Sequence, residues 1–271
     1  MSAASTVAPM SSRDRIVANL EACWQSLDAV CTDLGPDEWR TPSLCPAWTV
    51  HGVVSHLTAV EHGLAGWLPE SEDDPPPFGK VGEFMTEAES LSGAELHERL
   101  RAVLAVRRTE LAAMGDHEFD LPSMTPVGQA TYGRFMTIRE FDFWVHERDI
   151  RLPLGRPTDD GGAPAEMALD EVHLSFGYIV GKRVGMPDGT SIAVHLTGPV
   201  ERDLFAVVEG RASVVDHLPD PDVELTIDSL TFMLLACGRI DPQTAIDDGR
   251  VTWTGNPELG DKAARNLRFT M

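Results

Sequence analysis

Apolar residues recur every three or four positions over four long stretches in the first half of the chain. The first stretch runs from about Ser12 to Leu34, with Ile16, Leu20, Cys23, Leu27 and Val30 on one stripe. The others run from about Trp48 to Leu68, Ser92 to Met114 and Gly133 to Ile150. This period predicts amphipathic helices. We therefore expect an antiparallel four-helix bundle over residues 1–155.

The segments between these helices carry strong turn and capping signals. Residues 69–82 are acidic and proline-rich, and residues 115–131 contain two glycines and two prolines, so both are expected to be loops. Ser92 is followed three residues later by Glu95, which is the spacing of a capping box at a helix start.

The second half of the chain changes character after a linker rich in glycine and proline at residues 154–164. A helix is expected at 165–181. Short β-like runs follow at 191–196, 204–209, 212–216, 223–227 and 251–253, and helical segments at 228–237, 242–246 and 257–267. Strands mixed with helices in one small unit predict an α+β domain at 165–271.

Composition narrows the class of protein. The 271 residues are 42% hydrophobic and 24% charged, and the net charge is -21, so two globular domains are expected and nucleic acid or anionic membrane partners are not. No apolar run reaches the ~20 residues of a membrane span, and the polar start lacks a secretory signal. Four cysteines without C-x-x-C spacing fit reduced, cytoplasmic thiols. The pattern predicts no oligomeric state.

The candidate chemistry begins with Asp142 and His146, which are four residues apart and therefore share one helix face. A carboxylate and an imidazole suit zinc and other divalent transition metals, but a third ligand must come from another helix. Of the histidines on the second helix, His56 lies on the stripe of Val53 and Val60. We expect His56 to complete the site.

Plainer interpretations of the same residues stay open. Asp142 and His146 would also make an ordinary ion pair, and a lone buried histidine is usually only hydrogen-bonded. Asp149, three residues after His146, either accepts a hydrogen bond from that imidazole or caps the helix end, and a structural ion pair with Arg148, Arg151 or Arg139 is the favoured interpretation. Cys45 is either a reactive loop thiol or a structural one.

Two segments resemble the mycothiol-dependent maleylpyruvate isomerase family. Residues 44–57 (LCPAWTVHGVVSHL) match its Cys-Pro-x-Trp helix start, and residues 139–151 (REFDFWVHERDIR) match its Trp-x-His-x-x-Asp helix. The resemblance implies a DinB-like bundle whose zinc is held by His56, Asp142 and His146. The family usually has glutamate at the position of Asp142, and aspartate is one methylene shorter, so metal identity is left open.

Residues 225–239 and 251–255 are similar to the family's sterol-carrier-like C-terminal domain. The resemblance implies a zinc enzyme that activates mycothiol for addition to an electrophilic or unsaturated acid, with isomerisation favoured over S-transfer. Arg239 is the candidate for binding the substrate carboxylate, because arginine grips carboxylates with two hydrogen bonds. A thiol-independent metal hydrolase and a non-enzymatic metal- or ligand-binding module remain alternatives.

Overall fold

The computed structural model describes residues 11–270, which form two compact units. The first unit contains the residues up to Arg40 together with Val50–Phe143, and the second contains Thr41–Thr49 together with the chain from Trp144 onward. Helix α6 (Tyr132–Arg151) is unbroken across this division. The predicted domain boundary in the linker at 154–164 stays a prediction.

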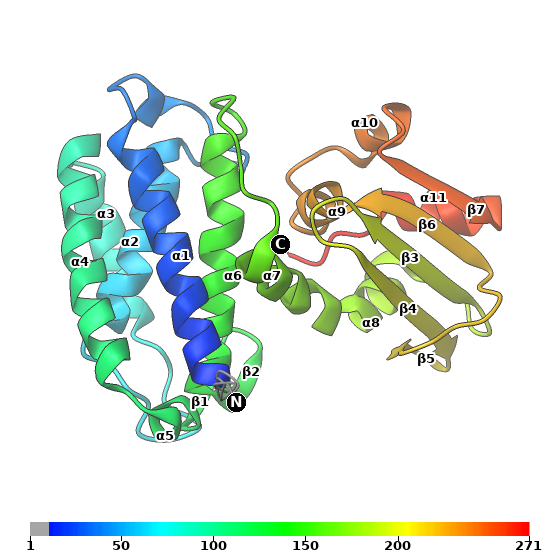
Figure 1. Cartoon of the computed structure of the whole chain (residues 1–271), viewed down its shortest axis with the longest axis horizontal. Helices are drawn as coiled ribbons and strands as arrows, with labels where there is room; N and C mark the ends of the chain where they lie inside the picture. The colour runs from blue at the N-terminus through cyan, green and yellow to red at the C-terminus, as the bar shows by residue number, and fades with distance from the viewer. Residues whose placement is uncertain (1–10, 271) are drawn as a thin grey trace, which may run out of the picture. The chain divides into compact units, whose positions relative to one another are not determined.

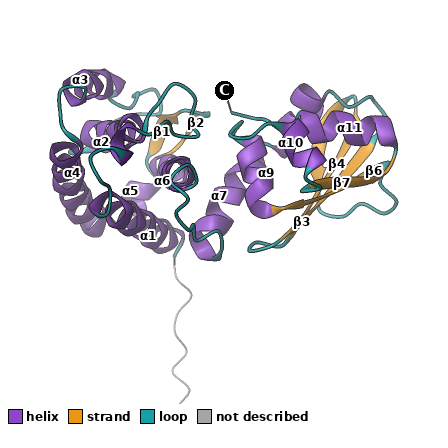
Figure 2. Cartoon of the chain, turned by 90° about the horizontal axis from the view of Figure 1, so that it is seen from above, coloured by secondary structure: helices purple, strands orange, loops and turns teal. Residues whose placement is uncertain are grey.

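The four predicted helices of the first half all form. They are α1 (Ser12–Thr32), α2 (Val50–Leu64), α4 (Gly93–Ala113) and α6, and they run side by side in Figure 1 and are seen nearly end-on in Figure 2. The capping box at the start of α4 is present, with the Ser92 side chain bonded to the Glu95 amide and the Glu95 side chain bonded back. Among the described residues, no helix combines the length and apolarity that a bilayer crossing requires.

Two segments expected to be loops are partly ordered. Helix α3 (Phe78–Ala88) begins directly after the proline run, which is tolerated at a helix start, and it packs on α2 through the buried Phe84 and Ala88. The 115–131 connection forms helix α5 (Asp116–Phe119) and a hairpin of β1 (Pro122–Thr125) and β2 (Gly128–Thr131). The Thr125 hydroxyl donates to the Gly128 carbonyl and fixes that turn.

The second half contains the expected mixture of strands and helices. One five-stranded sheet has the order β5-β4-β3-β6-β7, with β3 parallel to β6 and all other pairs antiparallel. Its strands are β3 (Ser191–Thr197), β4 (Arg202–Glu209), β5 (Arg211–Val215), β6 (Val223–Asp228) and β7 (Val251–Gly255). The expected single helix at 165–181 is instead α7 (Gly162–Leu174), α8 (Phe176–Tyr178) and a wider turn at Ile179–Val184.

Alternation along the strands separates a buried face from a polar one. Leu204, Ala206 and Val208 on β4 are buried, as are their counterparts on β6. Helices α8, α9 (Ser229–Ala236) and α11 (Pro257–Arg265) contact the strands, and α10 (Pro242–Asp247) packs beside α11. One face of the sheet therefore faces solvent, as is common in antiparallel sheets.

A buried ionic cluster lies among the helices of the first unit. Arg107 on α4 donates from Nε to Glu61 Oε2 on α2 at 3.0 Å, and Arg139 on α6 donates to Glu61 Oε1 at 2.9 Å. Arg107 also bonds the Tyr132 hydroxyl at 3.0 Å and Glu110 at 2.7 Å. Glu61 and Arg107 are 1% and 0% exposed, so every charge needs its partner.

The surroundings of this cluster keep its arginines charged. Burial acts to lower the pKa of Arg107, but the Glu61 carboxylate and the bonds to Tyr132 and Glu110 raise that pKa above its ordinary value. The same balance raises the pKa of Arg139, where Asp142 and Glu61 outweigh burial. Both guanidinium groups are therefore held in their charged form.

Replacing Glu61 by glutamine should destabilise the first unit strongly. The isosteric change leaves two buried guanidinium groups short of a carboxylate, and breaking a buried pair costs ~3–5 kcal/mol. Urea unfolding gives the free energy. The matched control is Glu87→Gln, which removes the exposed pair with Arg99 and should cost less than ~1 kcal/mol. Equal losses in the two variants would contradict the requirement that each buried charge of the cluster keep its partner.

On the polar face of the sheet, His195 lies between two carboxylates. Its Nδ1 is 2.7 Å from Asp203 Oδ1 and its Nε2 is 3.3 Å from Glu224 Oε2. The hydrogen bond with Asp203 is the largest influence, and it raises the pKa of His195 above its ordinary value. His173, by contrast, has a lowered pKa, mainly because it is partly buried.

These opposite shifts predict opposite effects of pH on stability. The contribution of His195 is fully present below the unfolded pKa of ~6.5 and is lost as pH rises through the higher folded pKa. Thermal unfolding of wild type and His195→Gln across this range should show the stability gap closing as pH rises. For His173→Gln, the difference in unfolding temperature in favour of the wild type should shrink as pH falls. A gap for His195→Gln that stays constant with pH would refute the linkage.

Candidate metal centre

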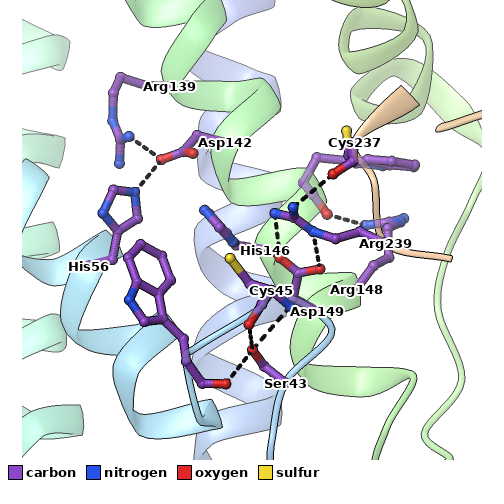
Figure 3. A network of polar contacts seen from close by, with 12 residues as sticks. Ser43, Cys45, His56, Arg139, Asp142, His146, Arg148, Asp149, Cys237 and Arg239 are labelled. Atoms are coloured by element: carbon purple, nitrogen blue, oxygen red, sulfur yellow. Dashed lines mark hydrogen bonds and ion pairs between the residues drawn. The ribbon is translucent and has the colours of Figure 1, made fainter. Parts of the chain in front are cut away.

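His56 on α2 and Asp142 on α6 face each other within the first unit. His56 Nε2 lies 3.2 Å from Asp142 Oδ2, and the two side chains are 23% and 24% exposed. Figure 3 shows the imidazole and the carboxylate pointing at one another from the two helices. Both groups are therefore packed enough to be oriented and open enough to be reached by a small molecule.

His146 follows Asp142 by one turn of α6 and is 6% exposed. One ligand atom from each of His56, Asp142 and His146 lies within 4.8 Å of the others. The structure thus brings together the three residues that the sequence singled out. Their assignment as metal ligands stays a prediction.

The donor set fits a divalent metal with a tetrahedral preference. Zinc binds imidazole nitrogen and carboxylate oxygen at ~2.0–2.2 Å, so two neighbouring ligands of a tetrahedron are ~3.4 Å apart. The 3.2 Å separation of His56 Nε2 and Asp142 Oδ2 is close to that spacing. The aspartate side chain is therefore long enough to place its oxygen at ligand spacing from the His56 nitrogen, without movement of either helix.

The other two histidines of α2 point elsewhere, as their spacing from His56 predicts. His51 Nε2 lies 3.0 Å from the Leu91 carbonyl. The ring of His62 packs on Phe84 with their centroids 5.2 Å apart. Neither belongs to the ligand groups found among the described residues.

Arg139, three residues earlier on α6, fixes the position of the Asp142 carboxylate by a hydrogen bond. Arg139 Nη1 donates to Asp142 Oδ2, the same oxygen that meets His56, while Arg139 Nε bonds the buried Glu61. Sequence reasoning missed the part played by Glu61 and its second partner, Arg107. The available signal was a charged residue at an apolar stripe position in each case, Glu61 beside Leu57 and Leu64, and Arg107 beside Leu104 and Leu111.

His146 has its own supporting carboxylate in the second unit. Its Nδ1 lies 2.8 Å from Asp149 Oδ2, and Asp149 is completely buried. An Nδ1–H that donates to the carboxylate leaves the Nε2 lone pair as the ligating one, which is the usual arrangement of histidine ligands. This contact matches the imidazole-orienting interpretation of Asp149, and the expected ion pair is also present, although with a different arginine.

The arginine that pairs with Asp149 is Arg239, not one of the three nearby arginines that the sequence offered. Arg239 Nε donates to Asp149 Oδ1 at 2.8 Å and Nη2 donates to Oδ2 at 3.0 Å. Arg148 instead bonds Asp160 in the linker, and Arg151 bonds Glu147. Arg139 is already engaged with Glu61 and Asp142.

Local backbone chemistry sets the position of Arg239 at the end of α9. Gly238 adopts a left-handed φ of 65°, its amide donates to the Leu235 carbonyl at 3.0 Å, and the Arg239 amide donates to the Leu234 carbonyl at 2.7 Å. This is a Schellman motif, in which glycine avoids the strain of positive φ. The Leu-Ala-Cys-Gly-Arg run therefore ends the helix and turns the arginine out of its axis.

The loop before α2 completes the surroundings of His146. The Ser43 hydroxyl donates to the Trp48 carbonyl at 2.8 Å, and the Leu44 amide donates to the Asp149 carbonyl at 3.1 Å. The Trp48 ring lies 5.8 Å from the His146 ring, centroid to centroid. This loop shields one side of the imidazole from water.

Cys45 in the same loop forms a second group of potential metal ligands with His146 and Asp149. The Asp149 carboxylate is already neutralised by both nitrogens of the Arg239 fork. A cation would have to displace that arginine. The group containing His56 and Asp142 is therefore the better candidate.

Comparison with known proteins identifies the two halves. The family model for the mycothiol maleylpyruvate isomerase N-terminal domain matches residues 20–151, and the model for the MDMPI C-terminal domain matches residues 166–260. Two proteins of Mycobacterium tuberculosis, from different strains and both named as uncharacterized, are 30% identical over 199 residues. That match covers 68% of this chain and 73% of theirs.

Among solved structures, the mycothiol-dependent maleylpyruvate isomerase and a histidine-to-alanine variant of it both match with a TM-score of 0.64. The identity is 14%, over 95% of this chain and 97% of theirs, so the likeness establishes the fold. It confirms the predicted class of a helical N-terminal domain followed by a small α+β domain. With both family models matched in order, the chain belongs to the mycothiol maleylpyruvate isomerase family and is an enzyme of that isomerase class.

Proposed function

We propose that this enzyme holds a zinc ion through His56, Asp142 and His146 and uses mycothiol to isomerise an unsaturated acid of the maleylpyruvate type. The observation that carries the proposal is the convergence of three donor atoms from two helices within 4.8 Å. Family membership supports mycothiol as the co-substrate. S-transfer, in which the thioether is kept, uses the same first step and is the less favoured outcome.

The metal would supply a Lewis acid that lowers the pKa of a coordinated thiol, so that a thiolate exists at neutral pH. The chain's own residues prepare the place for it. Asp149 holds the Nδ1 proton of His146, Arg139 fixes the Asp142 carboxylate, and the Trp48 ring covers one side of His146. The low exposure of His146 and Asp149 excludes water from this side of the site.

The reaction then follows from thiol chemistry. The thiolate sulfur adds to one carbon of the substrate double bond, and the electron pair moves toward the conjugated carbonyl. The former double bond is now single and rotates. Return of the electron pair expels the thiolate and restores the double bond in the trans form, so mycothiol is regenerated and no redox partner is needed.

Metal content tests the ligand assignment directly. Purified wild type should carry about one zinc per chain, and His56→Ala and His146→Ala should each lose it, because three protein ligands are the minimum of a catalytic zinc site. Elemental analysis after dialysis makes the measurement. His62→Ala is the matched control on the same helix and should retain the metal, since its ring packs on Phe84. Retention of metal by both ligand variants would overturn the assignment.

Thiol dependence tests the reaction. Conversion of maleylpyruvate to its trans isomer, followed by absorbance, should require mycothiol and should fall at least ~100-fold in Asp142→Ala, because the site loses its only anionic ligand. The free mycothiol concentration should be unchanged at the end of the reaction. Consumption of the thiol in proportion to product would mean S-transfer. Turnover without any thiol would overturn the thiolate mechanism but not the metal site.

A further inference from the structure

Arg239 was expected to bind the carboxylate of the substrate, but in the second unit its guanidinium group is bonded to the protein itself. All three guanidinium nitrogens have partners within the protein. Nε and Nη2 bond the two oxygens of Asp149, and Nη1 donates to the Cys237 carbonyl at 2.8 Å. The side chain is 9% exposed. The fork that would grip a substrate carboxylate is already filled by a carboxylate of the chain.

Asp149 in turn has a second partner on the oxygen that matters for His146. Its Oδ2 meets both Arg239 Nη2 at 3.0 Å and His146 Nδ1 at 2.8 Å, and its Oδ1 accepts from Arg239 Nε at 2.8 Å. Asp149 is 0% exposed and lies in the last turn of α6, where the helix dipole disfavours a negative charge. Arg239 is the cation that compensates this buried carboxylate.

From this chain of contacts we propose that Arg239 is a positioning residue. It fixes the rotamer of Asp149, and Asp149 fixes the ring orientation and tautomer of His146, so that Nε2 faces the ligand site (Figure 3). Partners that orient a ligating histidine typically contribute 10–100-fold to metal affinity. This inference rests on the proposed function for the identity of the metal, but its geometric part concerns the protein alone.

The experiment is a double-mutant cycle on Arg239→Gln and Asp149→Asn, read as zinc affinity by competition with a chromophoric chelator. Each single variant should weaken zinc binding by ~10–100-fold, and the double variant should be no weaker than Asp149→Asn, because Arg239 acts only through Asp149. The double variant also leaves no unpaired buried charge, which keeps the test valid where a single variant folds poorly.

Arg202→Gln is the matched control. Arg202 lies in the same α+β domain and pairs with the exposed Asp170. The zinc affinity of the Arg202→Gln protein should therefore equal that of wild type. Arg239→Lys keeps the charge but loses the fork and should lie between wild type and Arg239→Gln. Unchanged zinc affinity in Arg239→Gln, together with a raised KM for the acid substrate, would overturn the proposal and return Arg239 to the substrate.

A second measurement separates this inference from the proposed function. Nitrogen-15 NMR of the metal-free protein, at a pH above the ordinary histidine pKa, reports which ring nitrogen of His146 carries the proton. Wild type should show the Nδ1–H tautomer, and Arg239→Gln should show a mixture of the two tautomers. If wild type binds no zinc but this change occurs, the proposed function fails and the positioning role stands. An unchanged tautomer in Arg239→Gln would refute the positioning role.

Discussion

Asp142 and His146 stand one turn apart on α6, and the polar chemistry of the chain depends on keeping both side chains turned toward the same point. A helix fixes their Cα positions but not their rotamers. Each residue is therefore held by a second polar group, Arg139 behind Asp142 and Asp149 behind His146. These supports belong to the same helix, at spacings of three residues, so a single element carries both candidate ligands and their immediate partners.

The supports are themselves buried ions, and this explains the longer networks around them. Arg139 would be costly at 4% exposure if it had only Asp142, and Glu61 supplies a second carboxylate, which Arg107 then shares. Asp149 is compensated in the same way by Arg239. Each buried ion is thus paired with at least one group of opposite charge. The ionic groups contribute more to orienting the site than to net stability, because desolvation offsets most of their attraction.

The parts of this arrangement that sequence could predict are those encoded by local period. The four long helices, the strands and the shared face of Asp142 and His146 all follow from spacings of two, three or four residues. Helix α3 was missed because a proline run precedes it and only two of its residues, Phe84 and Ala88, are buried. The pair of Asp149 and Arg239 joins residues 90 positions apart. No local pattern distinguishes Arg239 from Arg148 or Arg151 as the partner, and only the packed fold selects it.

The short side chain of Asp142 matches the spacing of the two helices that meet there. His56 Nε2 and Asp142 Oδ2 are already 3.2 Å apart, so an additional methylene, about 1.5 Å of chain, would drive a carboxylate into the imidazole unless α2 or α6 withdrew or the side chain folded back. Arg139 reinforces this match, because it donates to the same oxygen of Asp142 that meets His56. The length of the acid and the separation of the helices therefore form one constraint. A change in either requires a change in the other.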